Sequence, residues 1–169
     1  MMKSVLYWLL AIILLIIVPV ADAQQTGKIF RIGYLDTGSA SGSAGLLEVF
    51  RQELTGLGWL GGKNLAIEYR FAEQKLERIP ELVADLLRMR VDLIVVTGTA
   101  SASAAKRATG SVPIVMANVG DPVGAGLVAS LARPGGNITG LSNLSPELNT
   151  KRLEILKDAV SNLARVGLL

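Results

Sequence analysis

The sequence predicts an α/β protein: a parallel sheet with helices on both faces. Strand-like and helix-like segments alternate from residue 29 onward, which is the order of repeated βα units. One segment, Asp92–Val96, is a continuous apolar run, the kind of strand that a parallel sheet buries on both faces. Right-handed crossovers between parallel strands then restrict the possible topologies.

The first two βα units occupy residues 29–90. Ile29–Leu35 is predicted to be a strand, and Ala44–Thr55 a helix, because its leucine and phenylalanine side chains recur on one helical face. Leu65–Phe71 alternates loosely and is rich in strand formers. Arg78–Arg90 is the second predicted helix, with Pro80 in its first turn, where a missing N–H costs little.

Apolar runs separated by turn residues mark the remaining units. After Asp92–Val96 they predict, in order, a helix at Ser101–Ala108, a strand at Pro113–Ala117, a short helix at Gly124–Leu131, a strand at Ile138–Leu141, a helix at Pro146–Val160 and the start of a strand at Val166–Leu169. Because that last strand has nothing after it, we expect the chain to be a fragment or the product of a shortened gene.

The N-terminus has the organisation of a secretory signal peptide. Lys3 precedes the unbroken apolar run Val5–Val18, and Ala21-Asp22-Ala23 supplies an A-x-A cleavage site. The alternative, an uncleaved membrane anchor, would need about 20 apolar residues, and this run is shorter. We therefore expect cleavage after Ala23, a mature domain of residues 24–169 in the periplasm, and no stable membrane insertion after cleavage.

Short polar loops follow four of the predicted strands. In open α/β sheets, ligands bind beyond the carboxyl ends of the strands. Small uncharged residues let a ligand approach the backbone, and the helices that follow point free N–H groups toward it. Any one of these residues could equally serve a turn or a helix cap, but four loops at one sheet edge favour a site. The candidate ligand-binding residues are Thr37, Ser39, Ser41, Thr97, Thr99, Ala100, Ser101, Asn118, Asp121 and Asn143.

The composition argues against catalysis and against a nucleic-acid partner. The chain has no His and no Cys, which excludes Ser-His and Cys-His pairs and zinc sites built on those ligands. The net charge of +3 is too scattered for a nucleic-acid interface. Gly56–Gly61 matches a dinucleotide fingerprint, but it follows a helix and precedes a strand, which is the wrong context. We expect no enzyme activity, no cofactor and no metal.

Several short motifs form one set of landmarks. They are Leu57-Gly58-Trp59, Gly62-Lys63-Asn64, Val91–Val95, Thr97-Gly98-Thr99, Val112–Val115, Asp121–Val128 and Ser130–Gly140. The stretch from Asp-Pro-Val-Gly at residue 121 to Pro-Gly-Gly-Asn-Ile-Thr-Gly at residue 134 is the most specific part. Together the motifs resemble the ABC-transporter substrate-binding proteins of the tryptophan/tyrosine type.

The resemblance implies a type I periplasmic-binding-protein fold, in which two α/β lobes clamp a ligand. Residues 24–169 would be the N-terminal lobe, with the second lobe absent. The implied function is uptake of a small molecule, with aromatic amino acids as the best-supported ligands, and the implied partner is an ABC permease in the inner membrane. A ligand carboxylate would suit the loop Thr99–Ser101, and its ammonium group would suit Asp121.

Two other functions remain open at the level of sequence. An uncleaved N-terminal helix would instead tether a ligand-sensing domain to the membrane. A hydrolase or nucleoside-processing enzyme of similar fold is the other alternative, and a carboxylate-bound metal would favour it, although no acidic cluster in the sequence supports such a site.

Overall fold

A computed structural model describes residues 28–143, 145–160 and 165 of the 169-residue chain. The predicted signal peptide, residues 1–23, and the predicted strand at 166–169 lie outside the described residues. None of the helices in the described part of the chain is long and apolar enough to span a membrane.

Five parallel strands form one sheet in the order β2-β1-β3-β4-β5. The strands are β1 (Phe30–Asp36), β2 (Leu65–Phe71), β3 (Leu93–Thr97), β4 (Ile114–Gly120) and β5 (Ile138–Asn143). The helices are α2 (Ala40–Gly56), α3 (Ile79–Arg88), preceded by the 3₁₀ turn η1 (Leu76–Arg78), α4 (Thr99–Ala108) and α5 (Ser145–Ala159). The strand order reverses direction between β1 and β3, so the loops after these two strands lie at a topological switch point.

The predicted α/β class and parallel sheet are confirmed, and one predicted element is wrong. The segment predicted as a helix at Gly124–Leu131 is a series of turns. One helical turn does form, since the Ala125 N–H donates to the Asp121 carbonyl at 3.0 Å. It is not continued, because Gly126 takes the left-handed conformation with φ 65°, which ends a helix.

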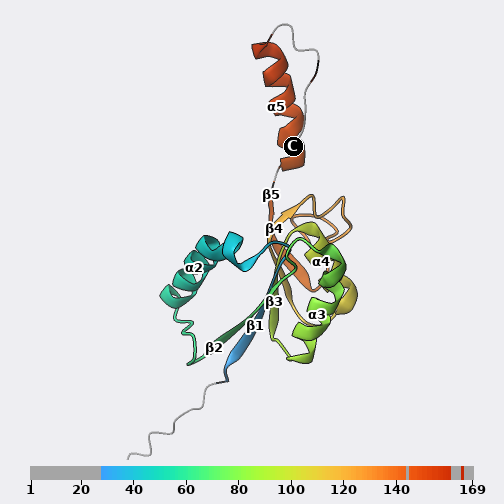
Figure 1. The fold of residues 1–169 in the computed structure, drawn as a ribbon. Coiled ribbons are helices and arrows are strands. Elements are labelled where there is room, and N and C mark those ends of the chain that lie inside the picture. The colour runs from blue at the N-terminus through green and yellow to red at the C-terminus, as the bar shows by residue number, and fades with distance from the viewer. Residues whose placement is uncertain (1–27, 144, 161–164, 166–169) are drawn as a thin grey trace, which may run out of the picture.

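Helices cover the two faces of the sheet to different degrees (Figure 1). Helices α3 and α4 pack on one face and α2 lies over the other. Side chains alternate along each strand, so Leu35, Ile94 and Val96 enter the α3–α4 core, while Tyr34 and Val95 face α2. Two side chains of α2 are buried, Ser43 and Leu47, whereas α3 buries four: Ile79, Leu82, Val83 and Leu86.

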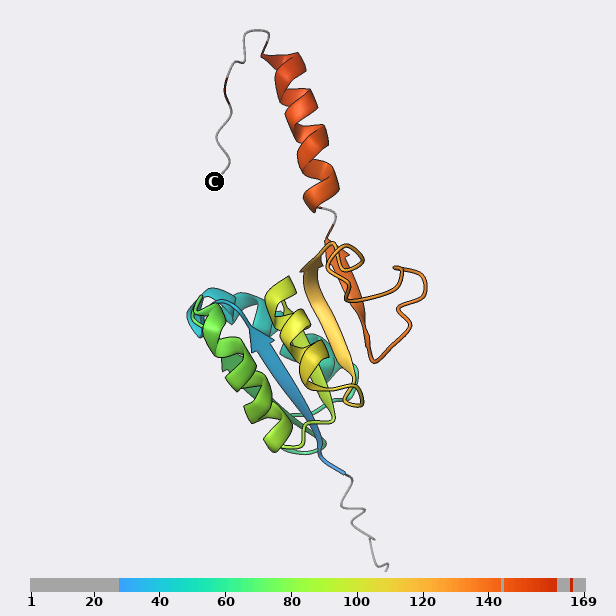
Figure 2. The ribbon, with the colours of Figure 1, turned by 90° about the vertical axis from the view of Figure 1, so that its right-hand side faces the viewer.

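Helix α5 extends away from the sheet in both views (Figures 1 and 2). A set of apolar side chains on this helix and just beyond its end is 38–58% exposed: Leu148, Leu153, Ile155, Leu156 and Val160. The predicted helix at Pro146–Val160 therefore forms, but it does not contribute to the core of this sheet.

Candidate ligand-binding site

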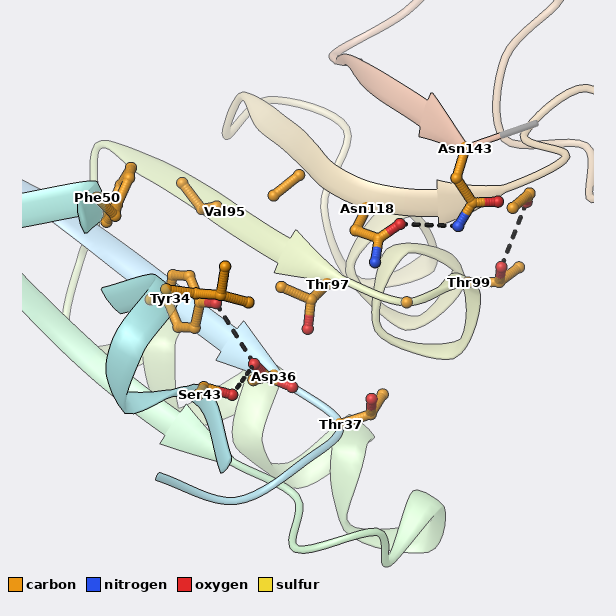
Figure 3. A pocket seen from close by; sticks show the side chains of 14 residues that line it. Tyr34, Asp36, Thr37, Ser43, Phe50, Val95, Thr97, Thr99, Asn118 and Asn143 are labelled. Carbon is orange, nitrogen blue, oxygen red and sulfur yellow. Dashed lines mark hydrogen bonds between the residues drawn. The ribbon is translucent and has the colours of Figure 1, made fainter. Parts of the chain in front are cut away.

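A cavity of about 630 Å³ lies at the carboxyl ends of β1, β3, β4 and β5, beside the N-terminal half of α2. This volume is within the usual range for small-molecule sites. Figure 3 shows Tyr34 and Phe50 toward one end of the cavity and Thr99, Asn118 and Asn143 toward the other. The pocket therefore has an aromatic end and a polar end.

The structure brings half of the sequence-predicted site residues to this cavity. Thr37, Thr97, Thr99, Asn118 and Asn143 line it. They come from the ends of four strands and from the first residue of α4, as expected from loops that converge on one edge.

The other predicted residues do not line the cavity. Ser39 is the N-cap of α2, its hydroxyl accepting from the Gly42 N–H at 3.1 Å, and the Ser41 hydroxyl lies 3.2 Å from the Ser39 hydroxyl. Asp121 accepts from the Gly124 N–H at 2.8 Å and so stabilises a turn. Ala100 and Ser101 lie in the first turn of α4. A role in ligand binding for these five residues stays a prediction.

Asp36, at the end of β1, is a pocket residue that the sequence analysis did not include. It is 8% exposed, and its carboxylate accepts from the Gly38 N–H at 2.8 Å and from the Ser43 hydroxyl at 2.7 Å. Burial raises the pKa of this carboxyl, but the surrounding donors outweigh burial and lower the pKa below its ordinary value. The Thr97 hydroxyl is near enough to help lower this pKa, although its geometry does not make a hydrogen bond.

Asp36 is thus a charged carboxylate that fixes the loop between β1 and α2. The sequence could have indicated Asp36 as a site residue, because it directly precedes the polar loop that begins at Thr37.

Tyr34 and Phe50 form the aromatic end of the pocket. Their ring centroids are 6.0 Å apart, and Tyr34 also lies 5.9 Å from Tyr69, within the range of favourable aromatic pairs. The Tyr34 hydroxyl donates to Asp36 at 3.4 Å. Burial, together with the Asp36 charge, raises the pKa of Tyr34 to about 12, so its hydroxyl stays protonated. Strand periodicity places Tyr34 on the same face as Asp36, but the sequence alone does not pair it with Phe50 on α2.

The polar end is built on the N-terminus of α4. The N-cap residue is Gly98, which has no side chain to accept from the first-turn N–H groups. Gly98 has φ 78° and ψ 151°, a conformation that is essentially restricted to glycine. The buried hydroxyls of Thr97 and Ser101 have no hydrogen-bond partner, and Thr99 makes a long contact of 3.4 Å to the Gly120 carbonyl. Of these residues, Thr97, Gly98 and Thr99 line the cavity, whereas Ser101 does not. The donors at this end are therefore the Thr97 hydroxyl and the N–H groups of the first turn of α4.

Two asparagines connect β4 and β5 at the rim of the pocket. The Asn143 amide N–H donates to the Asn118 side-chain oxygen at 2.7 Å (Figure 3). The Asn118 carbonyl accepts from the Gly98 N–H at 2.8 Å. Asn118 is thereby held both to the end of β5 and to the start of α4.

The charge on the pocket wall is negative. Asp36 lines the cavity, and within the described part of the chain neither Lys nor Arg does. A ligand carboxylate would therefore be bound by neutral donors, and a ligand cation would be attracted by Asp36. Among the described residues, no group of three or more His, Cys, Asp or Glu side chains is arranged to hold a metal ion.

Comparison with known families identifies the group to which this sheet and pocket belong. A family model described as "ABC transporter substrate binding protein" matches residues 44–169, which is most of the chain. The chain belongs to the ABC transporter substrate-binding protein family. The expected family resemblance is thus confirmed.

Three individual proteins provide further comparisons. A tyrosine-binding protein from Clostridioides difficile is 36% identical over 121 residues, or 71% of this chain. The structure of a conserved domain protein from Vibrio cholerae matches 80% of this chain with a TM-score of 0.71 and 30% identity. An ABC domain in complex with L-Trp from Streptococcus pneumonia matches 67% with a TM-score of 0.62 and 29% identity.

These relatives are much longer than the present chain. The chain spans 34% of the tyrosine-binding protein, 45% of the Vibrio cholerae structure and 38% of the L-Trp complex. The shared fold therefore covers less than half of each relative.

Proposed function

We propose that this chain is the ligand-binding lobe of an exported ABC-transporter substrate-binding protein whose ligand is an aromatic amino acid. The observation that carries the proposal is the two-ended pocket, with Tyr34 and Phe50 at one end and the uncapped N-terminus of α4 at the other. The names of two relatives, a tyrosine-binding protein and a domain in complex with L-Trp, support this ligand class.

We infer that the ligand carboxylate binds at the N-terminus of α4. Free N–H groups and the positive end of the helix dipole favour an anion there. The Thr97 hydroxyl, buried and without a partner, gains a hydrogen bond when a carboxylate arrives.

We infer that the ligand ammonium group binds at Asp36. This carboxylate lines the pocket, whereas Asp121, to which the family resemblance pointed, does not. An ionised carboxylate has about four acceptor positions. Three are used by Gly38, Ser43 and Tyr34, so one remains for a ligand.

Transport would follow from binding without any chemical step. The chain would be cleaved after Ala23, act in the periplasm and deliver its ligand to an inner-membrane permease. Because the chain spans 34–45% of the three relatives, full enclosure of the ligand would require the remainder of such a protein. We therefore expect weak binding by this lobe alone.

Nuclear magnetic resonance tests this proposal, because it detects weak binding residue by residue. Adding L-tryptophan or L-tyrosine to the 15N-labelled full chain should shift the amide signals of Thr97–Ser101 and leave those of α3 unchanged. Tyramine, which lacks the carboxylate, should shift the Thr97–Ser101 signals far less.

A matched pair of variants locates the ammonium site. Asp36→Asn should weaken L-tyrosine binding, and Asp121→Asn should not, since Asp121 lies outside the pocket. Thermal unfolding of both variants confirms that they are folded at the temperature of the titration. If folded wild-type protein shows no shift at Thr97–Ser101 with either amino acid, aromatic amino acids are not the ligands.

A further inference from the structure

We propose that Asn143 is a positioning residue, which orients the side-chain amide of Asn118. In this orientation Asn118 presents a hydrogen-bond donor to the pocket, so the pocket selects a ligand that carries an acceptor. The inference rests on the proposed function for the nature of the ligand.

The hydrogen bond between the two side chains sets the orientation of Asn118. An asparagine amide can present either its oxygen or its NH2 group to a given side. Here the Asn143 NH2 group donates to the Asn118 oxygen at 2.7 Å, which uses the acceptor of Asn118. The Asn118 NH2 group is left to point into the pocket, on the side of Thr97 (Figure 3).

The backbone holds both residues so that this orientation is maintained. Asn143 pairs with Gly120 in the β4–β5 register, two residues beyond Asn118. The register between these strands shifts between Met116 and Val119, in the segment that contains Asn118. The Asn118 carbonyl accepts from the N–H at the N-cap of α4 at 2.8 Å. The main chain of Asn118 is therefore held in place, and the hydrogen bond from Asn143 restrains the orientation of the Asn118 side-chain amide.

The result is a polar end that presents donors. The Asn118 NH2 group, the partnerless Thr97 hydroxyl and the uncapped first turn of α4 all lie at this end of the cavity. No Lys or Arg of the described residues lines the pocket to take their place. Hydrogen bonds to a charged acceptor are stronger than those between neutral groups. The pocket should therefore prefer a carboxylate to a carboxamide, and Asn143 should contribute to that preference through the orientation of the Asn118 amide.

Asn143→Asp tests the proposal, because an aspartate can accept from Asn118 but cannot donate to it. The Asn118 amide should rotate, donate its NH2 group to the introduced carboxylate and turn its oxygen into the pocket. In the ligand-free 15N-labelled chain, the side-chain NH2 signals of Asn118 should then shift and exchange more slowly with water. Asn143→Ala should leave the amide free to rotate, and Asn149→Asp, an exposed change on α5, should leave these signals unchanged.

Ligand preference supplies the second measurement. The ratio of the affinities for L-tyrosine and L-tyrosinamide should fall by about tenfold or more in Asn143→Asp, because one hydrogen bond to a charged group is lost and because the introduced carboxylate repels an anionic ligand. It should fall less in Asn143→Ala and remain at the wild-type value in Asn149→Asp. A ratio and Asn118 signals that are both unchanged in folded Asn143→Asp would overturn the proposal.

The two measurements separate this inference from the proposed function. If the wild-type chain binds neither compound, the proposed ligand is wrong, and the ligand-free Asn118 signals still decide the role of Asn143. A shift of those signals in Asn143→Asp would support the positioning role for a ligand of another class, and their constancy would overturn it.

Discussion

Asp36 accepts several hydrogen bonds where β1 meets the pocket. Its carboxylate accepts from a loop N–H, from Ser43 on α2 and from the neighbouring Tyr34 on β1. It was absent from the residues chosen from the sequence, because a single acidic residue after a strand does not show how many donors will surround it. The hydroxyl residues Thr97 and Thr99 were predictable, since loops after parallel strands must meet at one sheet edge.

Replacing Asp36 by Asn should change how stability depends on pH. The pKa of the folded Asp36 carboxyl is lowered, so its ionised form stabilises the fold above the unfolded pKa. That contribution is lost as the pH falls below about 4 and through the lowered folded pKa. Asp36→Asn should therefore be less stable than wild type at neutral pH, and the difference should shrink below about pH 4. Urea unfolding across the range from neutral to acid pH measures this; a difference that grows in acid would contradict it.

Gly98 should tolerate no side chain. Its φ of 78° and ψ of 151° cost a non-glycine residue about 1–3 kcal/mol. A Cβ atom would also lie 3.3 Å from the Thr37 side chain, inside the pocket. Gly98→Ala should therefore lower the free energy of unfolding by about that amount and weaken ligand binding. Gly110→Ala, where a Cβ would meet nothing within 4 Å, is the matched control. Equal stability of the two variants would show that Gly98 is not constrained.

At the scale of elements, periodicity predicted where helices form but not how deeply they pack. The apolar spacing within Ala44–Thr55 predicted one buried face for α2. In the structure Leu47 is buried, while Leu46 is 74% exposed. The β3 strand was predicted as fully buried, and its central residues 94–96 are indeed at most 5% exposed. A continuous apolar strand indicates burial on both faces of a sheet. The burial of an apolar stripe on a helix depends instead on how much of the sheet lies beneath the helix.

Ile94→Ala and Leu46→Ala should differ sharply in stability. Ile94 is fully buried between the sheet and α3–α4, so truncation should cost about 2–5 kcal/mol. Leu46 is largely exposed, and its truncation should change the free energy of unfolding by no more than about 0.5 kcal/mol. Denaturant unfolding followed by circular dichroism measures both. A loss below about 1 kcal/mol for Ile94→Ala would mean that β3 is not at the centre of the core.

At the scale of the whole molecule, the sheet and pocket stand apart from α5. The apolar spacing of residues 146–160 predicted the helix, but the surface that it covers depends on tertiary partners that periodicity does not describe. In the structure its apolar side chains are exposed, and in both ribbon views the helix lies beyond the end of the sheet (Figures 1 and 2). An exposed apolar face of this kind favours association between molecules.

Polar substitutions on α5 should therefore leave the sheet domain intact and reduce self-association. Leu153 and Leu156 are 38% and 39% exposed, and glutamine keeps the helix propensity close to that of leucine. The double variant Leu153→Gln/Leu156→Gln should change the free energy of unfolding by no more than about 0.5 kcal/mol and should shift sedimentation toward the monomer. Leu86→Gln places the same change in the buried face of α3, where it should strongly destabilise the fold. A decrease of more than about 2 kcal/mol in the free energy of unfolding of the α5 variant would be typical of core truncation. In that case α5 would have to pack against the sheet in solution, and the exposed arrangement of this helix would be wrong.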